Sequence, residues 1–429
     1  MAGAPSQEMY LDGVGPLAVE RPEHPDQVSE LVREAAARHA SVFPLGGGTL
    51  LDYGLPPVCT GYICDLTGLN RLVEYPAADM TVTVQAGRTL AQLQEILQER
   101  GQWLPIDVPL PQRTTLGGAL ATNLPGPRRY GYGTWRDYVL GMVVVNDRGE
   151  LTRSGGRVVK NVAGYDLHKL HIGALGTLGV IVEVTLKVRP LPQHNALLCW
   201  RCSERTLANF LDTVHRSQTR PVTVTVINKT AAHWCQAAPL WPESDQYLVF
   251  IGFEEKTSSV AWQREQICRE LAQVPESELV HEWTAAAGSA LWQWFADFPV
   301  LPSAKVSFRA NVLPSQTSFM LQSCRHLGEI GVVAHAGTGT IYGHWLDVTE
   351  SALVEQVRKL RDTLSALNRV SAEAAPASGR LILLRCPRAW KTPQLVWGEP
   401  AADQLLQHKV KQAFDPQNRF NAGRFPAGW

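Results

Sequence analysis

The feature that most constrains the fold is a run of three glycines in the segment Pro44–Thr49, at Gly46, Gly47 and Gly48. Glycine has no Cβ, so the backbone can turn sharply here and direct several N–H groups at one anion. Thr49 adds a hydroxyl at the end of the run. The functional interpretation is a phosphate cradle, and the alternative is a plain flexible turn, because glycine-rich turns are common.

Two more glycine-rich segments follow before residue 190. The segment 114–123 has paired glycines beside polar side chains, at Thr115, Gly117, Gly118, Thr122 and Asn123. The segment 173–181 has a glycine at every third position and then an apolar strand, with Gly176, Gly179, Val180 and Ile181 as its candidate site residues. None of these segments matches G-x-G-x-x-G on a βαβ unit or ends in G-K-[ST], which disfavours a Rossmann fold and an ATP-hydrolysing P-loop.

The distribution of residue types indicates two main domains. Of the 35 glycines, 24 precede residue 191, and of the 13 tryptophans, 11 follow it. The segment Lys187–Pro192, with two prolines, lies at the changeover. We therefore predict a loop-rich first domain at 1–190, a second domain at 191–400, and a tail at 401–429 that returns to the first domain.

Hydrophobic periodicity gives the expected elements of the first domain. Val28, Leu31, Val32 and Ala35 have helical spacing, and 42–43 and 80–85 read as strands. Thr89 and Gln92 form a capping box that opens a helix through Leu97. The Pro- and Gly-rich stretch from 105 to 138 reads as irregular, and strands resume at 138–145 and 179–188.

The second domain shows a repeated pattern. Strands are expected at 195–202, 221–228, 246–253 and 279–283, with helices at 206–217 and 258–272. A second set has strands near 304–312, 330–336, 340–347 and 380–385, with helices near 315–327 and 350–367. Each set has the β-α-β-β-α-β order of a ferredoxin-like unit. The predicted class is α+β, and a last helix is expected near 403–413.

Composition excludes several function classes. Forty basic residues balance forty acidic ones, so nothing indicates a nucleic-acid binder. No apolar run approaches the roughly 20 residues that span a bilayer, and the N-terminus lacks a signal-peptide pattern. Eight scattered cysteines in a chain of 429 residues are typical of reduced thiols. We expect a cytoplasmic protein without a membrane anchor of its own.

Taken together, the glycine segments resemble the FAD-binding domain of the vanillyl-alcohol oxidase/p-cresol methylhydroxylase (PCMH) superfamily. Within it, the chain is similar to the family of FAD-binding E subunits of bacterial glycolate oxidases. The matching segments are Pro44–Thr49, Thr115–Gly118, Gly126–Arg129, Lys160–Asp166, Gly173–Ile181 and the tail Asn421–Phe425. The resemblance implies a PCMH-type FAD-binding domain followed by a cap domain of ferredoxin-like units.

The resemblance also implies noncovalent FAD. Its pyrophosphate would bind Gly46, Gly47, Gly48 and Thr49, and its flavin ring would lie near the 115–123 segment. The nucleotide would be lined by Gly176, Gly179, Val180 and Ile181. Covalent relatives carry a histidine at the end of the first loop, where this chain has Thr49. Arg128 and Arg129 read as a solvated loop or a docking patch for another subunit, and the surface interpretation is slightly favoured.

The segment His335–Tyr342 departs from the family pattern. Catalytic 2-hydroxy-acid dehydrogenases of the superfamily carry H-x-G-D-G-N-x-H there, and its imidazoles hold a metal ion. This chain keeps His335 but has Thr338, Thr340 and Tyr342 at the Asp, Asn and second His. We therefore expect no metal site. His344 is read as a core or surface residue.

The resulting hypothesis is an FAD-binding subunit of a glycolate oxidase complex, with a catalytic FAD subunit and an iron–sulfur subunit as partners. Any membrane association would be peripheral to the inner membrane and through these partners. The alternatives are a self-sufficient FAD-dependent oxidoreductase of another alcohol or hydroxy acid, and a flavin-free scaffold. His335 and Lys305 are weak candidates for catalytic residues.

Overall fold

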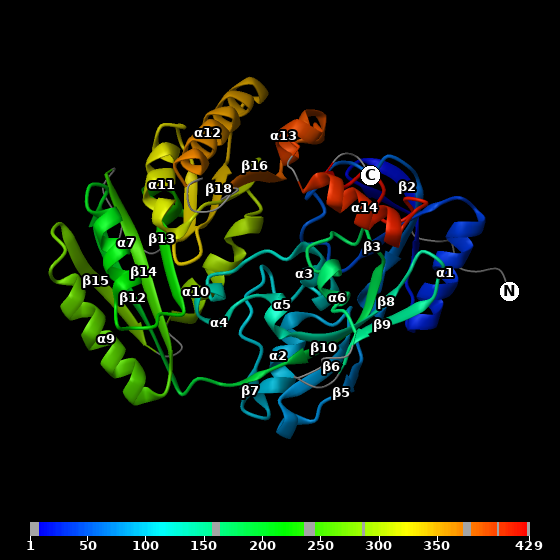
Figure 1. Cartoon of the computed structure of the whole chain (residues 1–429), viewed down its shortest axis with the longest axis horizontal. Helices are drawn as coiled ribbons and strands as arrows, with labels where there is room; N and C mark the ends of the chain where they lie inside the picture. Colours follow the sequence, from blue (N-terminus) through cyan, green and yellow to red (C-terminus); the bar gives the residue numbers. More distant parts are fainter. Residues whose placement is uncertain are drawn as a thin grey trace. The chain divides into compact units, whose positions relative to one another are not determined.

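The chain divides into two compact units in the computed structural model, which describes residues 8–156, 164–235, 245–284, 288–371, 379–400 and 403–426. Unit 1 comprises Met1–Leu124, Thr134–Leu191 and Lys391–Trp429, and unit 2 comprises Pro125–Gly133 and Pro192–Trp390. Figure 1 shows the chain coloured along its sequence. Residues 160–163 of the segment that resembles the PCMH family lie outside the described residues.

The first sheet of unit 1 has the strand order β1-β2-β4-β3. These strands are β1 (Glu8–Leu11), β2 (Val14–Glu20), β4 (Gly61–Asp65) and β3 (Ser41–Leu45), and β4 pairs in parallel with both β2 and β3. Helix α1 (Pro25–Ala37) buries the predicted apolar stripe at Val28, Leu31, Val32 and Ala35 in a core that also contains Phe420. The predicted helix and strand are therefore confirmed.

The second sheet of unit 1 is antiparallel, in the order β5-β6-β10-β8-β9. Its strands are β5 (Leu72–Glu74), β6 (Thr81–Gln85), β10 (Val180–Lys187), β8 (Val139–Val145) and β9 (Leu151–Gly155), and β7 (Gln102–Trp103) pairs separately with β11 (Arg189–Pro190). Helix α2 (Leu90–Gln98) begins at the predicted capping box. Gln92 N–H donates to Thr89 Oγ1, and Thr89 N–H donates to Gln92 Oε1.

The stretch from 105 to 138 is not structureless, so that prediction was wrong. It contains three short helices, α3 (Leu116–Thr122), α4 (Arg129–Tyr132) and α5 (Trp135–Tyr138). Two glycines inside α3 lower its intrinsic helix propensity, which hid it from the sequence. Thr115 caps α3 by accepting a hydrogen bond from Gly118 N–H at 3.2 Å, a capping signal that the sequence does contain.

Unit 2 is one eight-stranded antiparallel sheet in the order β15-β12-β14-β13-β17-β18-β16-β19. The first four-strand set is β12 (His194–Ser203), β13 (Thr223–Ile227), β14 (Gln246–Glu255) and β15 (Ser277–Thr284). The second is β16 (Val306–Asn311), β17 (Gly331–His335), β18 (Thr340–Trp345) and β19 (Arg380–Arg385). Read from its outer edge towards the middle of the sheet, each set has the strand order 4-1-3-2, which is ferredoxin-like. The second strands of the two sets, β13 and β17, pair with each other in the middle.

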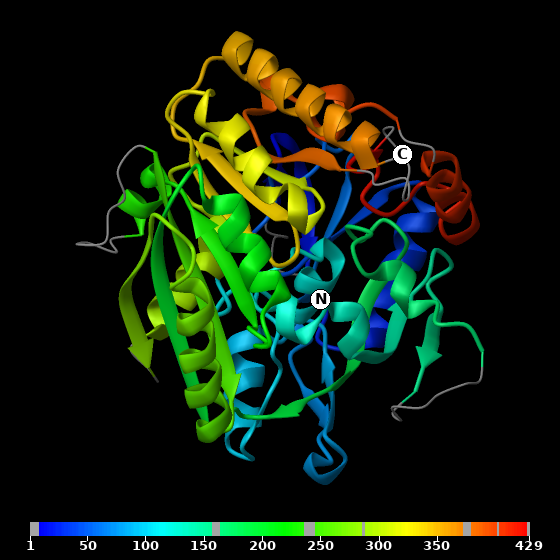
Figure 2. The ribbon, with the colours of Figure 1, turned by 60° about the vertical axis from the view of Figure 1, so that its left-hand side comes forward.

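Four helices form a layer on one face of this sheet (Figures 1 and 2). They are α7 (Leu207–Arg216), α9 (Thr257–Leu271), α11 (Thr317–Arg325) and α12 (Glu350–Ser371), close to the predicted bounds. The duplication predicted from sequence is therefore confirmed. Helices α8 (Lys229–Trp234) and α10 (Ser289–Asp297) were not predicted.

A buried ion pair holds the segment Pro125–Gly133 within unit 2. Arg128 Nη2 lies 2.8 Å from Glu254 Oε1, and Arg128 Nε donates to both carboxylate oxygens. The guanidinium also stacks on the Trp292 ring, 4.2 Å from its centroid. Only 16% of the Arg128 side chain and 2% of the Glu254 side chain are exposed. The surface interpretation of Arg128 was therefore wrong, because its charge has an intramolecular carboxylate partner that the sequence separates by 126 residues.

The C-terminal part of unit 1 contains α13 (Pro393–Trp397) and α14 (Gln404–Phe414). Lys391 begins this part and is almost fully buried, with its Nζ 2.6 Å from Asp12 Oδ2 and 2.6 Å from Asp52 O. Lys411 on α14 is also buried, and its Nζ donates to Thr177 O and to Asp415. Residues 391–400 belong to unit 1, although the sequence analysis assigned them to the second domain.

We predict that Glu254→Gln lowers the free energy of unfolding by about 3 kcal/mol, because it leaves the buried Arg128 charge without its partner. Chemical denaturation would measure this change. The matched control is Glu278→Gln, since Glu278 pairs with Arg201 but is 69% exposed, and its loss should cost less than about 1 kcal/mol. The double variant Arg128→Met/Glu254→Leu should recover most of the loss. Equal effects of Glu254→Gln and Glu278→Gln would contradict this account.

Candidate functional site

The glycine loop after β3 packs against the chain at 113–115 more closely than any side chain would allow. A Cβ on Gly46 would lie 2.1 Å from Thr115 Oγ1, and a Cβ on Gly47 would lie 1.7 Å from Arg113 O. Gly48 has a φ of +66°, in the left-handed region that favours glycine. Gly47 is therefore required by a backbone contact and Gly48 by its left-handed φ, and a Cβ on Gly46 would displace the Thr115 side chain. The loop is held in one place rather than being a plain flexible turn.

This loop leaves main-chain donors available. Within the described part of the chain, the N–H groups of Gly47, Gly48 and Thr49 donate no hydrogen bond. The Thr49 hydroxyl lies 3.1 Å from that of Thr114. Backbone N–H groups that converge in a turn are a common way to bind anionic oxygens. The loop thus has the donor set that a phosphate group requires.

Helix α3 provides the neighbouring wall. A Cβ on Gly118 would meet only Thr115 Oγ1, at 3.2 Å, so space lies beyond this glycine. Thr122 Oγ1 donates to Gly118 O at 2.9 Å, which uses its only proton inside the helix. The wall therefore offers a glycine surface, and the free lone pairs of Thr122 can still accept a hydrogen bond.

Two residues of the C-terminal tail complete the site. Asn421 Nδ2 donates to Leu175 O at 2.6 Å, and Arg424 Nη2 donates to Leu51 O and Tyr53 O. Arg424 Nη1 is buried and has no partner among the described residues. Burial lowers the pKa of the Arg424 guanidinium, and the nearby Asp12 and Asp52 carboxylates oppose this change. A buried cation with an unused donor fits an anionic ligand.

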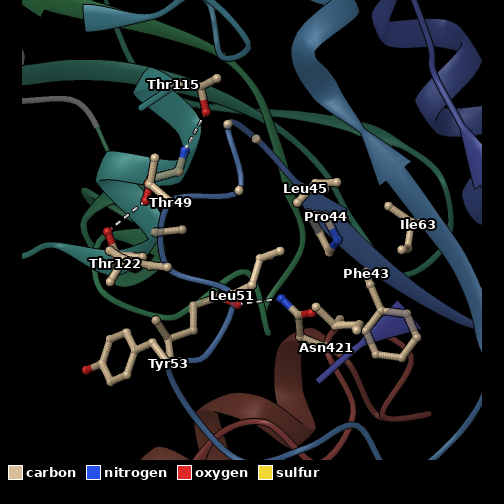
Figure 3. Close-up of a pocket in the computed structure, with 18 of the residues that line it drawn as sticks. Phe43, Pro44, Leu45, Thr49, Leu51, Tyr53, Ile63, Thr115, Thr122 and Asn421 are labelled. Carbon is tan, nitrogen blue, oxygen red and sulfur yellow. Dashed lines mark hydrogen bonds between the residues drawn. The ribbon is translucent and has the colours of Figure 1, made fainter. Parts of the chain in front are cut away.

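These residues line one open cleft in unit 1, shown in Figure 3. Thr49, Thr115 and Thr122 lie on one side of the view, and Phe43, Leu45 and Ile63 lie on the other. Counted with the open space at its mouth, the cleft is about 750 Å³. Of the predicted residues it brings together Gly46, Gly47, Gly48, Thr49, Thr115, Gly118 and Thr122.

The other predicted cofactor residues do not line this cleft. Gly117 packs on Ala86, where a Cβ would lie 3.0 Å from the Ala86 Cβ, and Asn123 ends α3 in a left-handed conformation. Gly179 lies against Val144, and the side chains of Val180 and Ile181 are buried on β10. Gly176 borders the site indirectly, since a Cβ there would lie 3.0 Å from Asn421 Nδ2. A role for these residues in nucleotide binding remains a prediction.

The sequence analysis missed Asn421 and Arg424 as site residues, although it noted the tail that contains them. Asn421 has a φ of +46°, and asparagine is one of the few residues besides glycine that adopt this conformation readily, so its residue type is the one usable signal. Nothing in the spacing reveals that the C-terminal tail meets the first loop, although Arg424 and Leu51 are separated by 373 residues. Tyr53 and Met9 were missed for the same reason.

In unit 2, His335 is a buried neutral histidine. Its Nδ1 lies 3.1 Å from Thr225 Oγ1, its ring packs edge-on against Tyr342, and its Nε2 has no partner among the described residues. Burial lowers the pKa of His335 to about 3. Tyr342 donates its hydroxyl to Pro125 O at 2.8 Å, so the position of the family's second histidine is used for an internal hydrogen bond.

His344 is also a core residue. Its Nδ1 lies 2.7 Å from Ser307 Oγ and its Nε2 pairs with Phe298 O, so neither ring nitrogen is open to a metal ion. Across the described residues, no three His, Cys, Asp or Glu side chains are grouped to hold a metal. Lys305 lies at the surface of unit 2 with Asp347 at 3.3 Å and Trp390 beneath it. Catalytic roles for Lys305 and His335 remain predictions.

Comparison with known proteins identifies the cofactor. Residues 16–155, which contain the glycine loop and α3, match the family described as FAD binding domain. The chain carries an FAD-binding domain of the PCMH type. FAD is confirmed as its cofactor, and the free N–H groups at Gly47–Thr49 and the unpaired Arg424 donor fit that group. The expectation of an FAD-dependent oxidoreductase is also confirmed.

Relatives agree with this assignment. D-2-hydroxyglutarate dehydrogenase of Xanthomonas citri pv. viticola is 29% identical over 95% of this chain and 89% of its own length. Glycolate oxidase subunit GlcD of Bacillus subtilis is 34% identical over 43% of this chain and 39% of its own length. Glycolate oxidase subunit GlcE of Escherichia coli is 35% identical over 39% of this chain and 48% of its own length. The two glycolate oxidase matches therefore each cover less than half of both proteins.

The fold has a close structural counterpart. Alkyldihydroxyacetonephosphate synthase superposes with a TM-score of 0.68, covering 94% of this chain and 76% of that protein. Sequence identity is only 16%, so this likeness concerns the fold alone. Together with the family match over residues 16–155, this likeness confirms the predicted class, a PCMH-type FAD-binding domain followed by a ferredoxin-like cap. No helix among the described residues is long and apolar enough to cross a membrane.

We predict that Gly47→Ala weakens FAD binding at least 10-fold, because its Cβ would overlap Arg113 O and displace the loop with its N–H donors. Fluorescence titration of the cofactor-free protein with FAD would measure the affinity. Gly288→Ala is the matched control, because its φ of −85° suits alanine, the nearest atom to a Cβ there lies 3.3 Å away, and Gly288 lies outside the cleft. Unchanged affinity in Gly47→Ala would contradict the role of this loop.

His335 makes stability depend on pH. Its pKa is about 3 in the folded protein and 6.5 in the unfolded chain, so only the unfolded chain binds a proton between these values. Stability is therefore lost as the pH falls from 6.5 towards 3. We predict that His335→Gln makes the dependence less steep by up to about 1.4 kcal/mol per pH unit. Urea denaturation from about pH 4.5 to about pH 8 would test this, and the two curves should run parallel above about pH 7.

Proposed function

We propose that the chain is the FAD-binding subunit of a glycolate oxidase or dehydrogenase complex that oxidises a 2-hydroxy acid to the 2-oxo acid. The observation that supports FAD binding best is the cleft of unit 1. Three free N–H groups at Gly47–Thr49 and the buried donor of Arg424 occur on its wall. All four are donors, which matches the oxygen-rich, negatively charged pyrophosphate of FAD.

The residues of the cleft would bind and orient the cofactor. The pyrophosphate would accept hydrogen bonds from the Gly46–Thr49 loop, and the flavin would lie along the glycine surface of α3 at Gly118. Thr115 and Thr122 would provide polar contacts at the two ends of α3. FAD held by these residues would supply a two-electron acceptor to the complex.

The proposed partners are a catalytic FAD subunit and an iron–sulfur subunit. Two relatives are named as glycolate oxidase subunits, GlcD and GlcE, which supports assembly with other chains. Loss of three positions of the histidine motif, at Thr338, Thr340 and Tyr342, supports oxidation on a sister subunit that keeps its metal. Electrons would then pass to the iron–sulfur subunit, because the cysteines of this chain are free thiols that form no metal-binding group among the described residues.

A second candidate is a self-sufficient dehydrogenase of a 2-hydroxy acid. The alignment with D-2-hydroxyglutarate dehydrogenase of X. citri covers 95% of this chain and so reaches well into unit 2, which favours a complete enzyme. Such an enzyme would have to work without the usual histidine motif. The flavin-free scaffold is disfavoured, because a scaffold would have no use for a loop with three unpaired N–H donors.

The test is the visible spectrum of the purified protein, followed by glycolate without oxygen. We predict a flavin spectrum that glycolate leaves unbleached in the isolated chain and bleaches after co-expression with the two partner subunits. Bleaching of the isolated chain by glycolate, D-lactate or D-2-hydroxyglutarate would favour the self-sufficient enzyme instead. A colourless protein that FAD cannot reconstitute would falsify both.

A further inference from the structure

The loop that follows the three glycines, residues 50–58, lines the FAD cleft and is bonded to a distant part of the chain. Leu51 and Tyr53 lie on the cleft wall (Figure 3). This cleft loop is neither helix nor strand, and inside it Tyr53 N–H donates to Leu50 O at 3.1 Å. Other main-chain groups of the cleft loop bond to residues 391–425 of unit 1, which we call the clamp segment.

Arg424 joins the clamp segment to the cleft loop in both directions. Its Nη2 donates to Leu51 O at 2.5 Å and to Tyr53 O at 2.8 Å. In return, Leu55 N–H donates to Arg424 O at 3.1 Å. The two backbones come this close at Gly54, where φ is +99° and a Cβ would lie 2.5 Å from Arg424 O. The cleft loop therefore depends on the clamp segment for its conformation.

A buried ion pair fixes the start of the clamp segment. Lys391 Nζ lies 2.6 Å from Asp12 Oδ2 and donates to Asp52 O at 2.6 Å. Only 1% of the Lys391 side chain and 7% of the Asp12 side chain are exposed. One ammonium group thus connects the clamp segment, the cleft loop and the turn after β1. Separating them would leave a buried charge without its partner, which is costly.

Aromatic contacts join the clamp segment to the cleft loop at α13. The ring of Trp397 packs on Tyr53 and on Phe425, with centroids 5.5 Å and 5.6 Å away. The indole Nε1 is buried and has no hydrogen-bond partner among the described residues, so ring contacts hold this side chain. Trp397 lies outside the cleft lining, whereas Tyr53 is part of it. Trp397 therefore acts on the cleft through Tyr53.

We propose that the clamp segment positions the cleft loop for FAD and sets the rate at which the cofactor leaves, with Lys391 and Trp397 as positioning residues. The free N–H donors at Gly47–Thr49 directly precede the cleft loop, so releasing this loop would end their arrangement around one anion. Thr49 occupies the position where covalent relatives carry a histidine, so retention of FAD depends on noncovalent contacts. The clamp segment must separate from the cleft loop before FAD can leave. This inference concerns the confirmed cofactor and is independent of the substrate.

The test is the rate at which FAD leaves the purified, FAD-loaded protein after dilution, measured from the flavin that passes a protein-retaining filter at successive times. Trp397→Leu removes both ring contacts and leaves the cleft lining intact, and it should speed release about 10-fold, as expected for the loss of two aromatic contacts. Trp397→Phe keeps a ring and should restore a rate close to that of wild type. Gly54→Ala, whose Cβ would push Arg424 O away from the cleft loop, should speed release by a similar factor.

Leu97→Ala is the matched control, because Leu97 is buried on α2 of unit 1 and lies outside the cleft. It should lower the midpoint of chemical unfolding more than Trp397→Leu does, and leave the release rate unchanged. Equal acceleration in Leu97→Ala and Trp397→Leu would show that release follows global stability, and this would overturn the clamp. A wild-type release rate in Trp397→Leu would overturn it as well. Should Trp397→Leu yield no folded protein, the rate in Gly54→Ala decides in the same way.

These outcomes are distinct from those that test the proposed function. A wild type with a flavin spectrum, and variants that all release FAD at its rate, would overturn the clamp alone and leave glycolate oxidation untouched. A wild type that FAD cannot reconstitute would overturn the clamp together with the proposed function, because both require the cofactor. Bleaching by glycolate bears on the reaction and does not enter the comparison of release rates.

Discussion

The FAD site depends on one close approach of two backbone segments. The loop at Gly46 and Gly47 touches Arg113 O and Thr115 Oγ1 at distances that would place any Cβ inside those atoms. Glycine at both positions therefore lets β3 and the start of α3 come together. Once they meet, Thr49 pairs with Thr114, and Thr115 caps α3. The N–H groups of Gly47–Thr49 remain free because the contact uses the Cα side of the loop rather than its donors.

Unit 2 forms one long sheet in which helices cover a face and the two inner strand edges are paired. Each ferredoxin-like set covers one sheet face with two helices, and joining β13 to β17 removes two edges that would otherwise be open to aggregation. The opposite face is then partly occupied by the segment Pro125–Gly133. Its buried Arg128–Glu254 pair is costly to desolvate, and the bidentate geometry and the Trp292 ring offset that cost.

Much of this fold could be predicted from local signals in the sequence. The elements that were missed depend on contacts between residues far apart in the chain. The capping box at Thr89, the stripe of α1 and both β-α-β-β-α-β sets were readable because each depends on residues close to one another in the chain. Helix α3 was missed because Gly117 and Gly118 lower helix propensity, while the contacts with Ala86 and the cleft that require them lie elsewhere in the chain. Arg128 was misread for the same reason, since its partner Glu254 is 126 residues away.

The residues of the site were also predicted where they belong to one local segment and missed where they come from a distant one. Gly46–Thr49, Thr115 and Gly118 were recognised from composition and resemblance, whereas Asn421 and Arg424 join the cleft only after the tail folds back onto unit 1. At the altered histidine motif, the sequence shows which residues replace the family's metal ligands. Only the structure shows which contacts these residues make. Tyr342 donates to Pro125 O, and Thr340 accepts from Asn311. His335 is neutral because burial keeps its pKa near 3. Positions 340 and 342 are therefore committed to hydrogen bonds within unit 2, and no local pattern in the sequence could have shown these bonds.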